Sequence, residues 1–220
     1  ELLKLQERGY PFCLVNQHYP AHRFPGIDAD HVNGSREAVR HLLAQGYRRI
    51  AFLNGPAEYS NSVDRLRGYE EALVEAGSTP QSNFIFEGNY SRKSGYQAAA
   101  SVAEKLAEID AVFVANDRMA VGLIQGLKER GIQVGVDVAI VGYDNTDASI
   151  MCDPPLSTVE VPFHAMGRRA AERMIEQITV DKNEYFYEKL RTKLIVRRSS
   201  REKFVPPFSQ RTFPQKSKGG

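Results

Sequence analysis

Apolar positions along the chain follow two alternating spacings. Short runs of β-branched and aromatic residues, bounded by turn formers, are separated by longer stretches in which apolar residues recur every three or four positions. The short runs are apolar at consecutive positions, as expected of strands that helices cover on both faces. They predict strands at residues 11–15, 49–53, 83–86, 111–115, 138–142 and 193–196.

The longer stretches predict helices. Residues 33–45 place Ala38, Val39 and Leu42 on one stripe and end before Gly46, a residue suited to close a helix. Comparable patterns predict helices at residues 62–76, 91–106, 117–130 and 163–178. Strands that alternate with helices indicate an α/β fold built on parallel sheets.

The two ends of the chain differ from this alternation. Residues 1–8 have a helical pattern without a capping residue, and the strand at 11–15 would open a sheet that lacks its first βαβ partner. We therefore expect residues of the same domain to precede Glu1. Residues 202–220 combine Pro, Ser, Gln, Lys and Gly without periodic apolar positions, which predicts a disordered tail.

Composition excludes several classes of protein. Hydrophobic residues make up 42% of the chain and charged residues 25%, with no apolar run long enough for a membrane span, so we expect neither a membrane protein nor wholesale disorder. A net charge of +2 is too balanced for a nucleic-acid-binding domain, so any DNA contact must lie elsewhere. The two cysteines, Cys13 and Cys152, form no disulfide framework, which favours a reducing cytoplasm.

Known catalytic and cofactor motifs do not occur in the sequence. Neither dinucleotide nor P-loop glycine fingerprints follow a predicted strand, and the sequence has no nucleophile elbow and no zinc-protease motif. His18 and His22 flank Pro20, which disfavours the helix that an i, i+4 metal pair needs. We therefore expect no enzyme, no cofactor and no metal site.

Polar residues follow several predicted strands at the carboxyl end, where open α/β sheets bind ligands. They are Asn16, Asn116, Asp117 and Asp144. Each is either a ligand contact or a local cap or turn former, and for Asp117 the favoured role is stabilisation of a helix N-terminus. Arg65 lies early in the helix at 62–76, where a cation is unfavourable unless it meets a ligand or a carboxylate.

Several segments resemble a known family in the same order. They are GSREAVRHLLAQGYRRIAFLNGP at 34–56, RLRGYEEAL at 65–73, ANDRMAVGLIQGLKERGIQVGVDVAIVGYDN at 115–145, PPLSTV at 154–159 and VPFHAMGRRA at 161–170. They are similar to the effector-binding core of the lactose-repressor family of bacterial transcription regulators. The similarity covers about residues 2–200, and separate motifs in the correct order are far more specific than any one of them.

The resemblance implies a periplasmic-binding-protein-like fold of two doubly wound parallel-sheet lobes, with three crossings between them and the effector in the cleft. The implied N-terminal lobe comprises residues 1–29 and 161–190 and is incomplete in this chain. The implied C-terminal lobe comprises residues 30–160 and 191–201. The family's DNA-binding headpiece, hinge helix and first strands would precede Glu1.

The resemblance also implies roles for single residues. Arg65 matches the arginine that holds the effector, and Asn116 and Asp144 match residues that bind its hydroxyls or ring nitrogens. Tyr90 and Phe163 match aromatic positions that wall the ligand, with ordinary packing as the alternative, and Asn16 falls where the incomplete lobe faces the cleft. An arginine, amide and carboxylate acceptors and an aromatic face suit a neutral polyhydroxyl ligand such as a sugar.

The implied function is ligand-controlled transcription regulation. A sugar-like effector would change the angle between lobes and so the spacing of two DNA-reading heads in a cytoplasmic homodimer on operator DNA. The candidate dimer surface includes the exposed side of the helix at 68–76 and the loop with Met151 and Cys152, for which packing within their own lobe is the alternative. The alternative is the solute-binding protein of a sugar transporter, which shares the fold.

Overall fold

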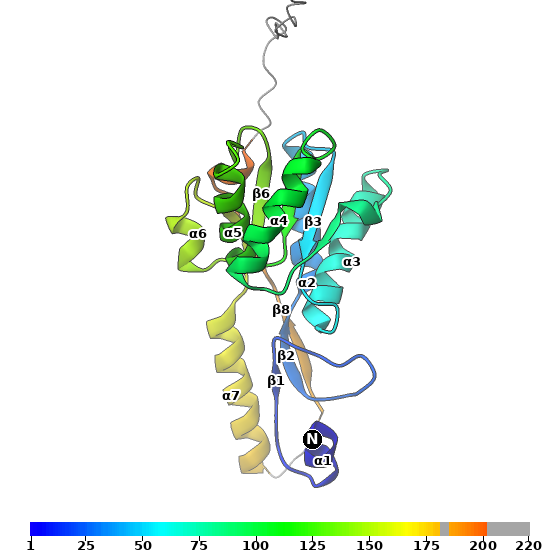
Figure 1. Ribbon diagram of the computed structural model, residues 1–220. Helices are drawn as coiled ribbons and strands as arrows, with labels where there is room; N and C mark the ends of the chain where they lie inside the picture. The colour runs from blue at the N-terminus through cyan, green and yellow to red at the C-terminus, as the bar shows by residue number, and fades with distance from the viewer. Residues whose placement is uncertain (181–184, 202–220) are drawn as a thin grey trace, which may run out of the picture.

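Two sheets organise the computed structural model, which describes residues 1–180 and 185–201 (Figure 1). The small sheet has the order β1-β2-β8 and is parallel throughout; its strands are β1 (Leu14–Val15), β2 (Gly26–Ala29) and β8 (Tyr187–Leu190). The large sheet has the order β4-β3-β5-β6-β7-β9. Its strands are β3 (Ile50–Asn54), β4 (Ile85–Glu87), β5 (Ala111–Val114), β6 (Ala139–Asp144), β7 (Ser157–Glu160) and β9 (Lys193–Ile195).

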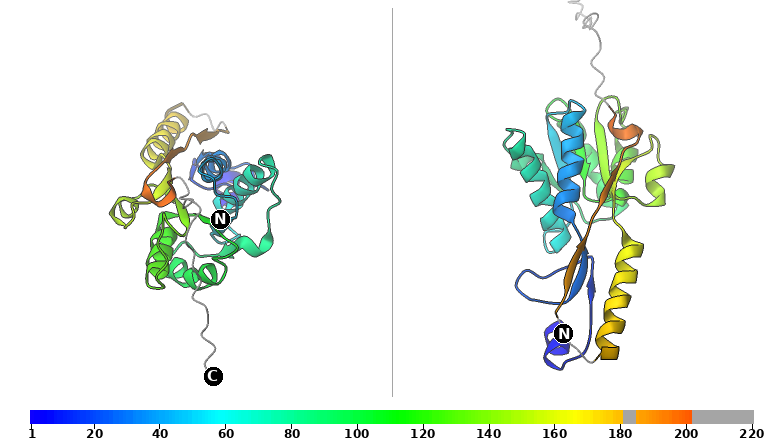
Figure 2. Two further views of the ribbon diagram at one scale, coloured as in Figure 1. Left: turned by 90° about the horizontal axis from the view of Figure 1, so that it is seen from above. Right: turned by 180° about the vertical axis from the view of Figure 1, so that it is seen from behind.

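Helices cover both faces of the large sheet. α2 (His31–Ala44) and α3 (Ser60–Glu75) pack together on one face, and α4 (Arg92–Glu104) and α5 (Asp117–Lys128) on the other (Figure 2). β3 and β5 are buried along their whole length, as their continuous apolar runs predict. At the centre, the ring of Phe52 stacks on Phe113 at 4.8 Å and on Tyr69 at 5.2 Å. The sheet with its helices therefore has a continuous aromatic and aliphatic core.

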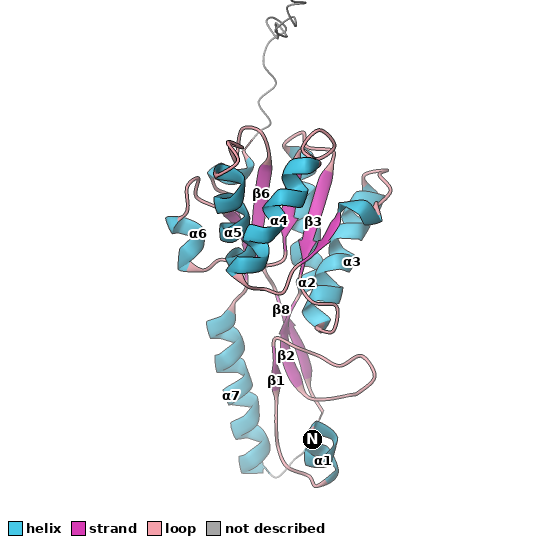
Figure 3. Cartoon of the chain, in the orientation of Figure 1, coloured by secondary structure: helices cyan, strands magenta, loops and turns pink. Residues whose placement is uncertain are grey.

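The small sheet packs against α7 (Phe163–Val180), with α1 (Leu2–Glu7) near its far end (Figure 1). Charged pairs fix α7 to β8: the Nε atoms of Arg169 and Arg173 each lie 2.7 Å from a carboxylate oxygen of Glu188. Figure 3 shows the long loop that joins β1 to β2. None of the helices in the two described stretches is long and apolar enough to cross a bilayer.

The chain passes between the sheets three times: from β2 to α2, from β7 to α7 and from β8 to β9 (Figure 1). The prediction of two parallel-sheet units with crossovers is confirmed, with the exception that β9 runs antiparallel to β7. The lobe boundaries at 29/30, 160/161 and 190/191 remain a prediction. The tail predicted at 202–220 lies outside the described residues.

Several elements were not predicted from the sequence. These are β2, β7, β8, the short helix α6 (Asp147–Met151) and the 3-10 turns at Ser82–Phe84 and Arg198–Ser200. β2 and β7 contain the polar residues Asp28, Ser157 and Thr158, all of which are buried. Their side chains hydrogen-bond to distant parts of the chain, so a search for apolar runs misses these strands.

Candidate functional site

A cleft of about 630 Å³ opens where the carboxyl ends of strands from the two sheets meet. The small sheet contributes Asn16, the residue after β1. The large sheet contributes Tyr90, beyond β4, and Tyr59 and Asn61 at the start of α3. The complete lining is Val15, Asn16, Gln17, Pro56, Glu58, Tyr59, Asn61, Asn89 and Tyr90. We name this volume the cleft.

Strained backbone is concentrated around the cleft. Among the described non-glycine residues, positive φ angles occur at Asn16 (60°), Tyr90 (64°), Asp144 (104°) and Asn145 (56°). This region is disfavoured for residues with a Cβ, and for a large residue such as tyrosine it is unusual. Three of the four were predicted as site residues. Such strain persists where the surrounding structure imposes it, typically at binding sites.

Arg65 is buried behind the cleft, with a relative exposure of 2%. Its Nη1 donates to the carbonyl oxygen of Ala115 at 2.6 Å, and its Nη2 lies 3.7 Å from Oδ1 of Asp144. The guanidinium also stacks over the ring of Tyr143, 4.1 Å from its centroid. In the part of the chain that the structure describes, Nε has no hydrogen-bond partner. Arg65 therefore has unused donor capacity in a dry environment.

Asp144 ends β6 and forms the ion pair with Arg65. Its side chain is 19% exposed, and burial raises its pKa from 3.8 to about 7, although the charge of Arg65 opposes this rise. The neighbouring carboxylate of Asp117 raises the pKa further. The hydrogen-bonding capacity of this carboxylate is poorly satisfied within the described residues, so a ligand hydroxyl that donates to it would stabilise its charged form.

Tyr90 forms a fixed aromatic wall. Its ring lies against Gly55, where an added Cβ would collide with it, and faces the ring of Tyr59 at 6.1 Å. Its Oη donates to Oδ1 of Asn61 at 2.8 Å and lies 2.5 Å from Oγ of Ser62. These contacts therefore hold the ring in place, although the backbone of Tyr90 has a positive φ angle.

Asn116 and Asp117 lie at the start of α5, and the side chains of both form hydrogen bonds within the protein. Asn116 caps the helix by accepting from the backbone N–H of Met119 at 2.9 Å, and its Nδ2 donates to the carbonyl oxygen of Tyr90 at 3.1 Å. Asp117 is fully buried and accepts from Thr158 Oγ1 at 2.6 Å and from the backbone N–H of Thr146 at 2.7 Å. Asp117 is therefore structural, the role favoured from the sequence, whereas Asn116 supports the backbone of Tyr90.

Phe163 is the first residue of α7 and is 45% exposed. It follows β7, whose last residue, Glu160, pairs in register with Asp144. The residue therefore lies at the correct edge of the large sheet and is not packed in a core. It is not among the residues that line the cleft.

Sequence reasoning missed a buried polar group beneath the cleft. His31 is completely buried at the start of α2, and its Nε2 lies 3.0 Å from Oδ1 of Asn16. Asp28 is also buried and accepts from Tyr187 Oη at 2.7 Å, with His18 Nδ1 at 3.1 Å. Only the position of His31 between the end of a strand and a helix start could have indicated it, since its partners are distant in sequence.

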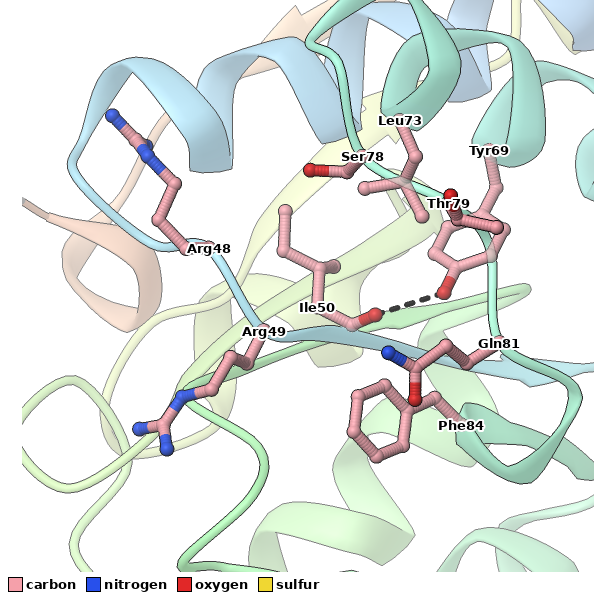
Figure 4. A pocket seen from close by; sticks show the side chains of 9 residues that line it. All are labelled: Arg48, Arg49, Ile50, Tyr69, Leu73, Ser78, Thr79, Gln81 and Phe84. Atoms are coloured by element: carbon pink, nitrogen blue, oxygen red, sulfur yellow. Dashed lines mark hydrogen bonds between the residues drawn. The ribbon is translucent and has the colours of Figure 1, made fainter.

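A second pocket, of about 320 Å³, lies at the start of β3 (Figure 4). Asn54 is at the other end of this strand. Although Arg48 and Arg49 border it, their side chains point away from the pocket in Figure 4. Their guanidinium groups donate to backbone carbonyls of Leu43, Tyr47 and Ala107. This pocket therefore offers a ligand no free cation from either arginine. Within the described residues, no group of three His, Cys, Asp or Glu side chains could hold a metal ion.

Comparison with known proteins places this geometry in a family. A family model described as a periplasmic binding protein-like domain matches residues 39–200. The transcriptional regulator CelR of Thermobifida fusca is 34% identical over 197 residues, 89% of this chain and 58% of that protein. The chain thus spans less than two thirds of the length of this curated relative.

Solved structures agree with the sequence relatives. The solved structure of a complex of the transcriptional regulator CelR with cellobiose superposes with a TM-score of 0.83 at 34% identity, covering 89% of this chain and 60% of that one. A LacI-family regulator from Enterococcus faecium with bound ribose has a TM-score of 0.82 at 28% identity, covering 90% and 73%. The predicted fold and family are therefore confirmed: the chain belongs to the periplasmic binding protein-like domain family, and the proteins it resembles are regulators of the lactose-repressor family.

Proposed function

We propose that this chain is the effector-binding core of a ligand-controlled transcription regulator and that it binds a sugar in the cleft. The observation that carries the proposal is the pair of buried Arg65 and partly buried Asp144, with unused donor and acceptor capacity, behind a cleft walled by Tyr90. The relatives support it, since one was solved as a complex with cellobiose and another with bound ribose.

The residue types suit a polyhydroxyl ligand. Arg65 donates to hydroxyl or ring oxygens, and Asp144 accepts from hydroxyls, so together they can bind adjacent groups of opposite hydrogen-bonding sense. Tyr90 offers an aromatic face to the apolar C–H side of a sugar ring. Asn16, from the small sheet, would contact the same ligand, and Phe163 would complete the wall. Asn116 would contribute mainly by holding Tyr90.

Regulation would follow from the position of the cleft between the two sheets. A ligand that contacts both Asn16 and Asp144 favours the relative orientation of the sheets in which both contacts form. Lobes divided at 29/30, 160/161 and 190/191 would then move about the three crossings. Operator DNA would be contacted by a headpiece outside this chain, in a cytoplasmic protein without catalytic activity.

The regulator would act as a homodimer, because a palindromic operator matches a two-fold protein. Met151 is 82% exposed at the end of α6, and Pro154, three residues on, helps to line a hollow of about 440 Å³ whose other lining residues include Ile132, Val136, Lys128 and Asp153. The other surface considered, on α3, lies on the opposite side of the large sheet (Figures 1 and 2). A two-fold interface is one continuous patch, so we assign it to the Met151 surface.

Calorimetric titration with cellobiose and with ribose tests the effector proposal. Replacing Arg65 by Met keeps an apolar chain in the buried space but removes every donor. We expect at least one of the two sugars to bind the wild type, and R65M to lose about 10- to 100-fold in affinity. The control is R48M, in the second pocket, which should bind like the wild type. Wild-type chain that binds neither sugar, or R65M that binds normally, would contradict the proposal.

A further inference from the structure

His31 lies at the junction between the two sheets, directly beneath the cleft. It is the first residue of α2, which follows the crossing from β2, and its ring is fully buried. One ring nitrogen points to the small sheet and its loop, the other to Arg65 and Tyr143 of the large-sheet part. The ring therefore bridges the two walls of the proposed effector site.

The partners of the ring determine which nitrogen carries the proton. Nδ1 lies 3.5 Å from Nη2 of Arg65 and 3.3 Å from Oη of Tyr143. A guanidinium can only donate, so Nδ1 must offer its lone pair. Nε2 then bears the hydrogen, and it faces two oxygens: Oδ1 of Asn16 at 3.0 Å and Oδ1 of Asp28 at 3.6 Å.

The ring is neutral in this environment. Burial lowers the pKa of His31 well below 6.5, and the charges of Arg65, Lys189 and His18 lower it further. A second proton would sit on Nδ1, against the guanidinium of Arg65. The carboxylate of Asp28 faces the other nitrogen and is already bound by Tyr187 and His18.

The state of His31 fixes the amide of Asn16. Because Nε2–H donates to Oδ1, the Nδ2 end of the amide is left with no hydrogen-bond partner among the described residues. Asn16 lines the cleft, so this NH₂ group is available to a ligand. The positive φ of 60° at Asn16 further restricts the backbone from which the amide projects.

We propose that His31, as its neutral Nε2–H tautomer, is a positioning residue that turns Asn16 to present only hydrogen-bond donors to the effector. This inference rests on the proposed function. Arg65, on the large-sheet side, is also a donor, so the two residues together select an effector group that accepts, such as an ether or ring oxygen or a hydroxyl acting as acceptor. Asp144 is the acceptor of the site. The site thus presents donors from both sheets and an acceptor from the large sheet alone.

The tautomer is measured on the free chain, with no ligand. Long-range ¹H–¹⁵N correlation spectra of ¹⁵N-histidine-labelled protein distinguish the two neutral tautomers from the charged ring. The His31 signals are those that disappear in H31N. We expect an Nε2–H pattern at pH 7; an Nδ1–H or a charged pattern would overturn the inference. This result does not depend on whether any sugar binds.

Two variants then separate the contacts of the ring. The amide oxygen of H31N can occupy the place of Nδ1 and accept from Arg65, but nothing replaces the donor to Asn16. The amide nitrogen of H31Q can reach the place of Nε2 and donate to Asn16, but nothing replaces Nδ1 as an acceptor for Nη2 of Arg65. Both variants remove the buried imidazole and put a side-chain amide in its place.

Cellobiose is the ligand for the second test. Its binding is measured by calorimetry, and the state of the Asn16 amide is measured from its side-chain NH₂ signals, which are identified by their loss in N16D. We expect N16D to bind cellobiose about 10- to 100-fold more weakly than wild type. H31Q should retain the wild-type pair of Asn16 signals, and H31N should alter them and reduce the penalty of N16D. Equal Asn16 signals and equal N16D penalties in all backgrounds would show a merely structural histidine. If wild-type protein does not bind cellobiose, the result counts against the proposed sugar effector. The tautomer of His31, measured on the free chain, would still decide whether the present inference holds.

Discussion

Replacing Asp144 by Asn tests whether the folded chain disfavours the charged form of this carboxyl group. The carboxyl is held behind the cleft with Arg65 at 3.7 Å as its ion-pair partner, and its pKa is raised by burial from 3.8 to about 7. A raised pKa means that the folded chain disfavours the charged form. This contribution to stability is therefore fully present below pH 3.8 and is lost as the pH rises through about 7.

The shift sets the size of the effect. About three pKa units at about 1.4 kcal/mol each give an upper limit of about 4 kcal/mol between the two extremes of pH. Between pH 4.5 and 8.5, and after allowing for partial solvent screening, we expect about 2 to 3 kcal/mol. The amide of D144N has the same shape and does not titrate, so its free energy of unfolding should lack this component.

Urea unfolding, followed by circular dichroism at several pH values, measures the difference between D144N and wild type. We expect D144N to gain stability relative to wild type as the pH rises, by about 2 to 3 kcal/mol over this interval. The control is D147N, on the exposed start of α6, which removes one carboxylate and leaves the pair of Arg65 and Asp144 unchanged. A difference in unfolding free energy between D144N and wild type that does not change with pH, or that grows toward acid pH, would refute the raised pKa of Asp144.

Three further outcomes are expected. Gly55→Ala should displace the ring of Tyr90 and cost about 1 to 3 kcal/mol in urea unfolding, whereas Gly167→Ala, whose Cβ meets nothing within 4 Å, should be neutral or slightly stabilising; equal effects would show that the ring yields freely. Met151→Asp should shift the dimer toward monomer in sedimentation velocity, and an unchanged sedimentation coefficient would place the interface elsewhere. This 220-residue chain, with a net charge of +2, should give no specific operator retention in a gel shift at physiological salt, and nanomolar retention would contradict that expectation.

The sequence predicted the elements whose burial is apolar. β3, β5 and β6 are runs of buried aliphatic and aromatic side chains, and the helices around them have clear stripes and glycines beyond their ends. β7 was missed because Ser157 and Thr158 are buried through hydrogen bonds to Arg197 and Asp117, which lie about 40 residues away. Local pattern contains no information about such partners.

The candidate site was predicted to a similar extent. Strand ends indicated Asn16 and Asp144, the position of Arg65 early in a helix indicated that residue, and the family resemblance added Tyr90; the structure brings these side chains close to one cleft. His31 was missed because its hydrogen-bond partners, Asn16 and Tyr143, are 15 and 112 residues away. A histidine at a helix start has no distinctive local spacing, so only the fold could connect it to the ligand-facing amide.

The central claim, that a sugar binds between the two sheets against Arg65 and Asp144, is tested most directly by mapping cellobiose and ribose on the ¹⁵N-labelled chain by NMR. We expect at least one sugar to shift the signals of Asn16 and Tyr90, which line the cleft from its two sides, and of Asp144 behind it. Saturating concentrations of both sugars that leave these signals unchanged, or that shift only residues around the second pocket, such as Ser78 and Thr79, would contradict it.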